Sequence, residues 1–349
     1  MRHSLCKISL SVPPRLHAGF RAGWSWMFTL DDLDRASAVV RAAMPPTPQH
    51  AWPLLAERLG CTVVVKHENH TPIGAFKVRG GLVYVERLVR ERPQVGGIVS
   101  ATRGNHGQSL ALAGRRFGRP VTIVVPHGNS VEKNAAMRAF GAELVEHGRD
   151  FDDAKQHAAT LARESGFEFV PSFHSDLVTG VATYARELFD AAPDLDVVYA
   201  PIGLGSGICG LIRTRDLLRL KTEIVGVVPA GANAYRLSFE AGRVVPVNRT
   251  ATFADGAAVR VPDPEALAII RAGAARIVEV TEDEVAEAVR IFHEDTHNLA
   301  EGAGALALAA LVRERSRLTG RAAGVILSGG NIDRVWAADI LAGRTPSAA

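Results

Sequence analysis

A chain of 349 residues is long for one compact hydrophobic core, so its length favours two lobes or two domains. Hydrophobic residues make up 47% and charged residues 22%, the balance of an ordinary soluble globular protein. A net charge of +3, with no long block of Lys or Arg, gives no basis for a nucleic-acid-binding protein.

The ends and the cysteines of the chain point to a cytoplasmic protein. Cys6, Cys61 and Cys209 are odd in number, far apart and without a CxxC pair, so the sequence suggests neither a disulfide framework nor a zinc site. No apolar run reaches the roughly 18 residues of a membrane span, so no membrane partner is expected. Residues 1–26 are basic and lack a continuous apolar segment, which predicts a disordered extension rather than a secretion signal. Thr29 is expected to cap a first helix.

Apolar, β-branched runs alternate with amphipathic segments from about residue 60 onward. The strands are expected at 61–68, 96–102, 120–126, 142–147, 167–173, 195–203, 222–229 and 322–331. The helices are expected at 74–91, 108–118, 131–141, 150–166, 206–218, 281–295 and 301–317. This alternation predicts an α/β fold built on open parallel sheets.

A glycine-rich segment at 203–207, Gly-Leu-Gly-Ser-Gly, lies between a predicted strand and a predicted helix. Backbone amides in such a turn, together with the helix N-terminus, favour a bound phosphate. The glycine spacing matches neither the Walker pattern nor the dinucleotide-binding pattern. Taken alone, this segment is equally well explained as a tight corner between strand and helix.

Three further segments can carry chemistry. Lys77 follows a glycine and has apolar neighbours, and a desolvated lysine has a lowered pKa and can form a Schiff base. Residues 102–106, Thr-Arg-Gly-Asn-His, and Ser328 each follow a buried strand, where open α/β sheets place their ligands. Amides and a hydroxyl at 102–106 can bind a carboxylate, and the Ser328 hydroxyl can pair with a neutral ring nitrogen. Individually, Lys77 and Ser328 are better explained as a solvated lysine and a plain turn, and 102–106 is equally well explained as a turn.

In this order, the four segments resemble the motifs of fold-type-II pyridoxal 5′-phosphate (PLP) enzymes, the tryptophan synthase β-like superfamily. The likeness covers about 45–335 and is strongest to the serine/threonine dehydratase and serine racemase branch. It implies an α/β fold of two open parallel-sheet lobes with PLP in the cleft between them. Residues 27–96 and 175–349 would form the large lobe, and 97–174 a small inserted lobe that closes over substrate. The family also implies a homodimer.

The resemblance implies a role for each matching residue. Lys77 would hold PLP as a Schiff base and act as general base, with Phe76 packed near the ring. Asn105 would bond the phenolic oxygen, and Ser328 the pyridine nitrogen. The phosphate would bind the amides of Gly203, Leu204, Gly205, Ser206 and Gly207, and the substrate carboxylate would bind Thr102, Arg103, Gly104, Asn105 and His106. Residues 254–256 (Ala-Asp-Gly) and 301–304 (Glu-Gly-Ala-Gly) match two further family segments.

The implied activity is β-elimination from a small β-hydroxy amino acid such as L-threonine or L-serine, giving a 2-oxo acid and ammonia. The alternatives are a lyase for another β-substituted amino acid (3-hydroxyaspartate, phenylserine, diaminopropionate or an osmolyte-derived compound) and a β-replacement enzyme. A PLP-free ligand-binding protein is disfavoured because it would not need Lys77. A nucleotide-binding protein is disfavoured because no ribose-binding acid follows 203–207 at the usual spacing.

Several positions depart from the family pattern. Arg103 replaces a serine that serves serine racemase as second base, which predicts elimination without efficient racemisation because arginine stays protonated. Arg103 can instead bind a second anionic group of the substrate, or be a solvated or ion-paired residue at the rim. Val228 and Ala234 occupy positions where metal-binding carboxylates are usual, so no Mg²⁺ or Ca²⁺ site is expected.

Several aromatic side chains remain ambiguous in the sequence. His67 and His70 flank the Lys77 loop and either line the substrate pocket or serve the structure. Trp52, Tyr235 and Phe253 are compatible with a roomier pocket and equally with ordinary core packing.

Overall fold

The computed structural model describes residues 27–347, so the extension expected at 1–26 lies outside the described part. The chain forms a six-stranded sheet, in the order β1-β2-β10-β7-β8-β9, and a four-stranded sheet, in the order β5-β4-β3-β6. All neighbouring strands are parallel except β1 and β2, which pair antiparallel at one edge of the larger sheet. The predicted α/β class with parallel sheets is therefore confirmed, with one antiparallel edge strand that the sequence did not suggest.

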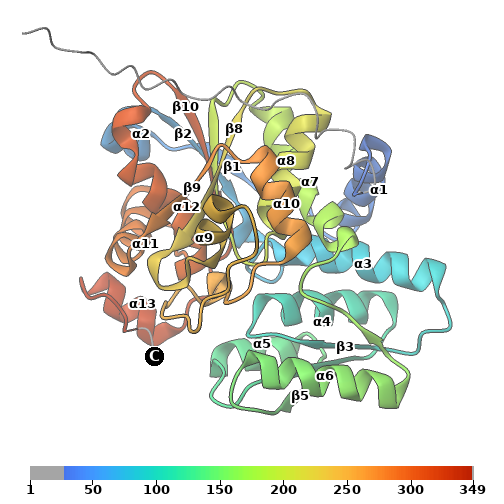
Figure 1. Cartoon of the computed structure of the whole chain (residues 1–349). Helices are drawn as coiled ribbons and strands as arrows, with labels where there is room; N and C mark the ends of the chain where they lie inside the picture. The colour runs from blue at the N-terminus through green and yellow to red at the C-terminus, as the bar shows by residue number, and fades with distance from the viewer. Residues whose placement is uncertain (1–26, 348–349) are drawn as a thin grey trace, which may run out of the picture.

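The strands of the larger sheet are β1 (Gln49–Ala51), β2 (Thr62–His67), β7 (Val197–Pro201), β8 (Glu223–Pro229), β9 (Arg276–Val280) and β10 (Ala322–Leu327). The smaller sheet consists of β3 (Ile98–Ala101), β4 (Val121–Val125), β5 (Glu143–Glu146) and β6 (Glu168–Phe169). In the sequence the smaller sheet interrupts the larger one, between β2 and β7. Figure 1 shows it as a separate unit below the larger sheet.

The helices are α1 (Leu30–Arg41), α2 (Pro53–Leu59), α3 (Lys77–Glu91), α4 (Asn105–Phe117), α5 (Val131–Ala139), α6 (Phe151–Ser165), α7 (Ser175–Ala191), α8 (Ser206–Leu217), α9 (Ala234–Ala241), α10 (Pro264–Gly273), α11 (Glu282–Thr296), α12 (Gly302–Arg313) and α13 (Arg334–Leu341). Helix α3 runs between the two sheets in Figure 1 and packs against both α4 and α7. No helix within residues 27–347 is long and apolar enough to cross a membrane.

Two helix starts differ from the sequence prediction by three residues, and both belong to predicted ligand-binding segments. The helix expected from residue 74 begins at Lys77, because Gly74 has φ +70° and 71–76 form a loop. The helix expected from 108 begins at Asn105, which places Asn105 and His106 in its first turn. Thr29 caps the first helix as predicted, and Thr281, which precedes the acidic first turn of the helix expected at 281–295, is likewise the cap that this sequence pattern favours. Each accepts a backbone N–H and completes a capping box.

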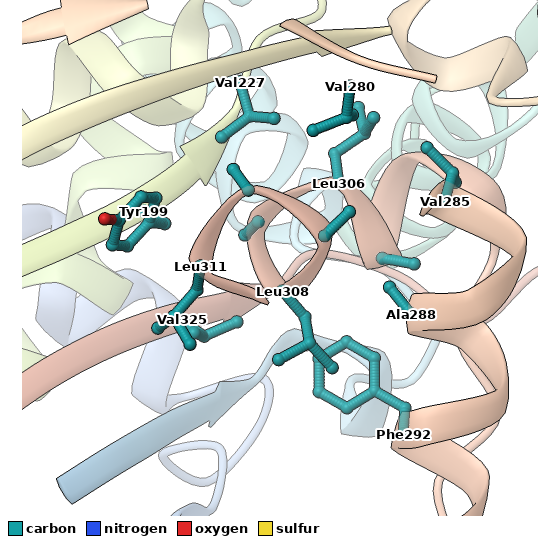
Figure 2. Packing of buried hydrophobic residues seen from close by; sticks show 14 of the residues in the cluster. Tyr199, Val227, Val280, Val285, Ala288, Phe292, Leu306, Leu308, Leu311 and Val325 are labelled. Atoms are coloured by element: carbon teal, nitrogen blue, oxygen red, sulfur yellow. The ribbon is translucent and has the colours of Figure 1, made fainter. Parts of the chain in front are cut away.

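Helix α12 forms the centre of the largest hydrophobic cluster. Its residues 302–311 are all buried, as expected for a helix that is apolar on every side. Figure 2 shows Leu306, Leu308 and Leu311 between sheet residues such as Val325 and the side chain of Phe292 on α11. This packing fixes the N-terminal end of α12, and Glu301 with it, beside the carboxyl ends of the central strands.

Candidate active site

The predicted site residues all line one cavity of about 450 Å³. It opens where loops that follow strands of the two sheets face each other. From the larger sheet come Phe76, Lys77, Gly203, Leu204, Gly205, Ser206, Gly207 and Ser328, and from the smaller sheet come Thr102, Arg103, Gly104, Asn105 and His106. The carboxyl-edge rule for open parallel sheets explains why segments so distant in sequence meet here.

Lys77 is the first residue of α3 and is partly buried in the cavity wall. Its Nζ lies 5.2 Å from the centroid of the Phe76 ring. Loss of hydration lowers the pKa of Lys77 to about 8, and the nearby carboxylate of Glu301 opposes this shift. The unprotonated amine, which is the form that attacks an aldehyde, is therefore far more populated near neutral pH than in an ordinary lysine.

The loop at 203–207 connects β7 to the N-terminus of α8. Gly205 has φ +105°, and a Cβ on Gly203 would lie 2.5 Å from the carbonyl oxygen of Gly256, so both positions require glycine. Two tyrosine hydroxyls bind the carbonyls of this loop: Tyr235 donates to Leu204 at 2.8 Å, and Tyr184 donates to Gly207 at 2.9 Å. Because its carbonyls are held this way, the loop presents backbone amides to the cavity, where an anion is favoured.

The donor set suits PLP. The 203–207 amides and the α8 N-terminus match a phosphate, and Lys77 supplies an amine for the aldehyde. The hydroxyl of Ser328 has only a long contact of 3.5 Å to the Ala303 carbonyl, so it is available to a ring nitrogen. PLP bound here would supply an electron sink for a carbanion formed next to an amine.

The segment 102–106 is preorganised by local contacts. Thr102 Oγ1 accepts the Gly104 N–H at 3.0 Å. His106 is buried, and desolvation together with the charge of Lys77 lowers its pKa to about 3, so its ring is neutral. The Nε2 atom of His106 has no hydrogen-bond partner within the described residues.

Arg103 is exposed at the cavity and has neither an ion pair nor a hydrogen bond from its side chain within residues 27–347. The ion-paired rim arginine considered from the sequence is therefore not what the structure shows. A cationic side chain without a carboxylate partner faces the ligand space.

Sequence reasoning gave no role to three charged residues that line the cavity. Glu301, the N-cap residue of α12, accepts a hydrogen bond from Asn105 Nδ2 at 2.8 Å. Burial raises the pKa of Glu301 to about 7, against the opposing charge of Lys133. Lys133 on α5 forms an ion pair with Asp255, so it links the smaller sheet unit to a loop of the larger one. The family match at 254–256 and 301–304 was the signal available for Asp255 and Glu301.

The ambiguous aromatic residues do not line the cavity. His67 is buried and accepts from Trp52 Nε1 at 2.9 Å, and His70 contacts Asn298 at 2.7 Å. Phe253 lies in the hydrophobic core, and Tyr235 serves the 203–207 loop rather than the pocket space. The structural explanation holds for all of them.

The sequence predicted no Mg²⁺ or Ca²⁺ site near the end of β8, because two positions there lack carboxylates. Val228 lies in this strand, Ala234 begins α9, and both side chains are buried. Within residues 27–347, no three His, Cys, Asp or Glu side chains are grouped so as to hold a metal ion.

Residues 40–329 match the model of the pyridoxal-phosphate-dependent enzyme family, and the chain belongs to this family. An L-threo-3-hydroxyaspartate ammonia-lyase of Saccharomyces cerevisiae is 32% identical over 317 residues, which cover 90% of this chain and 97% of the relative. An L-threonine ammonia-lyase of Geobacter sulfurreducens is 38% identical over 280 residues, or 80% of this chain and 69% of the relative.

Solved structures agree with this assignment. The processed form of threonine deaminase isoform 2 from Solanum lycopersicum superposes with a TM-score of 0.82 at 30% identity, covering 90% of this chain and 94% of that one. Maize serine racemase, at 24% identity, shares the fold with a TM-score of 0.84 and coverage of 89% and 95%. The predicted family and the predicted cofactor, PLP, are confirmed.

Proposed function

We propose that this enzyme eliminates the β-hydroxyl group of a small amino acid such as L-threonine or L-serine, releasing a 2-oxo acid and ammonia. The observation that carries the proposal is the position of Lys77, whose partly buried amine shares one cavity with the 203–207 amides and with Asn105. The names of the relatives, L-threonine ammonia-lyase and L-threo-3-hydroxyaspartate ammonia-lyase, support the reaction class.

The geometry supports the following roles. Lys77 binds the cofactor and, once released, its amine removes the Cα proton, which its lowered pKa favours near neutral pH. The backbone and Thr102 hydroxyl of 102–106 hold the substrate carboxylate, next to the neutral ring of His106. The chain is proposed to form two lobes: a large one from 27–96 and 175–349, and a small one from 97–174. Closure of the small lobe over the large one would exclude water from the site.

A substrate panel tests the proposal. The purified protein, loaded with PLP, is given L-serine, L-threonine, both diastereomers of 3-hydroxyaspartate and phenylserine, while 2-oxo acid and ammonia are measured. Equal amounts of both products from at least one hydroxy amino acid are expected. PLP binding without either product from any of these compounds would contradict β-hydroxyl elimination and favour another leaving group or β-replacement.

A dicarboxylic substrate is the second candidate, and Arg103 favours it. The side chain is exposed at the cavity with no acidic partner among the described residues, next to the segment proposed to bind the α-carboxylate. Guanidinium groups match carboxylates with two parallel hydrogen bonds. The Saccharomyces cerevisiae relative and a Pseudomonas sp. relative, 32% identical, are both named L-threo-3-hydroxyaspartate ammonia-lyase.

Replacing Arg103 with glutamine is expected to lower kcat/KM for 3-hydroxyaspartate by roughly 10- to 100-fold, the value of a charge-assisted hydrogen bond. The value for L-serine should change less than about threefold, because serine has no second carboxylate. The same measurement on Arg138→Gln, an exposed arginine of α5 outside the cavity, serves as control. Equal losses for both substrates would assign Arg103 to the α-carboxylate instead.

Two further expectations remain part of the proposal. A homodimer is expected from the family resemblance. A cytoplasmic location is supported by Cys61 and Cys209, which are both buried and unpaired in the described chain.

A further inference from the structure

The amide of Asn105 is held at both of its ends. Its Nδ2 donates one hydrogen to Glu301 Oε1 at 2.8 Å, and its Oδ1 accepts from Asn331 Nδ2, also at 2.8 Å. These partners lie 196 and 226 residues away in the chain, at the start of α12 and after β10. Asn105 itself begins α4, beside the smaller sheet.

Asn331 does not line the cavity, and its own orientation is fixed by the loop that precedes Lys77. Its Nδ2 also donates to the Ile73 carbonyl at 2.7 Å, so both hydrogens of this amide are used. A Cβ on residue 74 would lie 2.6 Å from the Oδ1 of Asn331, so this close approach requires Gly74, which also has φ +70°. A rotated Asn331 amide would oppose its oxygen to the oxygens of Ile73 and Asn105.

The two contacts leave Asn105 only one favourable orientation. If its amide were flipped, its oxygen would face the carboxylate of Glu301 and its nitrogen would face the nitrogen of Asn331. The contact with Asn331 would then join two donors at any pH, and the contact with Glu301 would join two acceptors wherever that carboxyl, whose pKa is about 7, is ionised. The observed orientation is therefore strongly selected, and it leaves one N–H of Asn105 without an acceptor among residues 27–347, on a residue that lines the cavity.

We propose that Asn331 is a positioning residue: with Glu301 it fixes the Asn105 amide so that its remaining N–H is presented to the phenolic oxygen of PLP. This rests on the proposed role of Asn105. Asn331 itself does not contact the ligand space, and it acts by keeping the acceptor oxygen of Asn105 turned away from the cofactor. Because Asn331 donates to both Ile73 and Asn105, it also fixes the position of the Lys77 loop relative to the start of α4.

Equilibrium binding of PLP and of 3-deoxy-PLP, which lacks the phenolic oxygen, tests this without any catalysis. The ratio of their dissociation constants reports the hydrogen bond to that oxygen, and the intrinsic difference between the two compounds cancels when variants are compared. Asn331→Ala is expected to reduce the preference for PLP about fivefold, the value of one net hydrogen bond. Asn331→Asp has the same shape but lacks the donor, and it should give a similar loss. Asn105→Ala, which lacks the proposed donor itself, should show the weakest preference for PLP over 3-deoxy-PLP.

Asn298→Ala is the matched control, because Asn298 is also hydrogen-bonded at its amide, to Asn69, but lies outside the cavity. Its ratio should equal that of the wild type even if the protein is destabilised. An unchanged ratio in both folded Asn331 variants would overturn the inference and leave the proposed reaction intact. A wild type that binds PLP but releases no 2-oxo acid would contradict the reaction, and the ratios would still decide the role of Asn331.

Discussion

Replacing Lys77 with alanine is expected to abolish the visible absorption of lysine-bound PLP and to lower turnover by about 10³-fold or more. The loss combines the missing covalent attachment with the missing general base, and a positioned base alone contributes about 10²–10⁴-fold. The relevant features are the position of Lys77 in the cavity wall and its pKa of about 8. Absorption spectra of the PLP-loaded protein and 2-oxo acid assays measure the two effects.

Lys221→Ala, at an exposed lysine, is the control and should keep both the absorption band and the activity. Retention of the lysine-bound band in Lys77→Ala would show that another amine holds the cofactor. Lys133 is the other lysine in the cavity wall that is buried, but its Nζ is engaged by Asp255.

The second large effect concerns Arg79, whose side chain is 0% exposed and lies two positions after Lys77. Its guanidinium binds both oxygens of Glu68, at 2.7 and 2.9 Å, and both oxygens of Glu187, at 2.9 and 2.8 Å. Lys66 adds a second buried cation, 2.6 Å from Glu187. Burial alone would raise the pKa of Glu187, but hydrogen bonds from Arg79 hold it below its ordinary value.

Arg79→Met is expected to lower the free energy of unfolding by about 3–5 kcal/mol, the usual loss when one partner of a buried ion pair is removed. The methionine fills most of the volume but leaves Glu68 and Glu187 with one cation, Lys66, between them. Urea unfolding followed by circular dichroism gives the change. Because α3 begins at Lys77, PLP affinity should fall together with stability.

Arg90→Met, on the same helix, is the control: it measures how much an exposed guanidinium contributes to the free energy of unfolding. Arg90 is 55% exposed and pairs with Glu86 at i, i+4, so its replacement should cost less than about 1 kcal/mol. A loss of that small size at Arg79 would mean that the buried cluster contributes little and that its carboxylates become protonated.

The amino-acid sequence by itself determined the α/β class, the family and a part of the residues that line the cavity. Each of the four predicted segments comes after an apolar strand in the sequence: Lys77, 102–106, 203–207 and Ser328. Because parallel strands end at a common edge, these local signals sufficed to bring Lys77, Asn105 and Ser328 to one place. The capped helix starts at Thr29 and Thr281 were likewise local and were predicted correctly.

Only the tertiary structure decided which side chains support these residues. Asn331 and Glu301 meet Asn105, and Glu187 meets Arg79, across 226, 196 and 108 residues of chain. Such pairs depend on how helices pack on the two sheets and how the two sheet units face each other, and no local sequence pattern encodes these relations. The left-handed turn at Gly74 also depends on this context, and it makes α3 start at Lys77 instead of three residues earlier. The local pattern identified residues that line the cavity, whereas long-range packing fixes the partners that orient them.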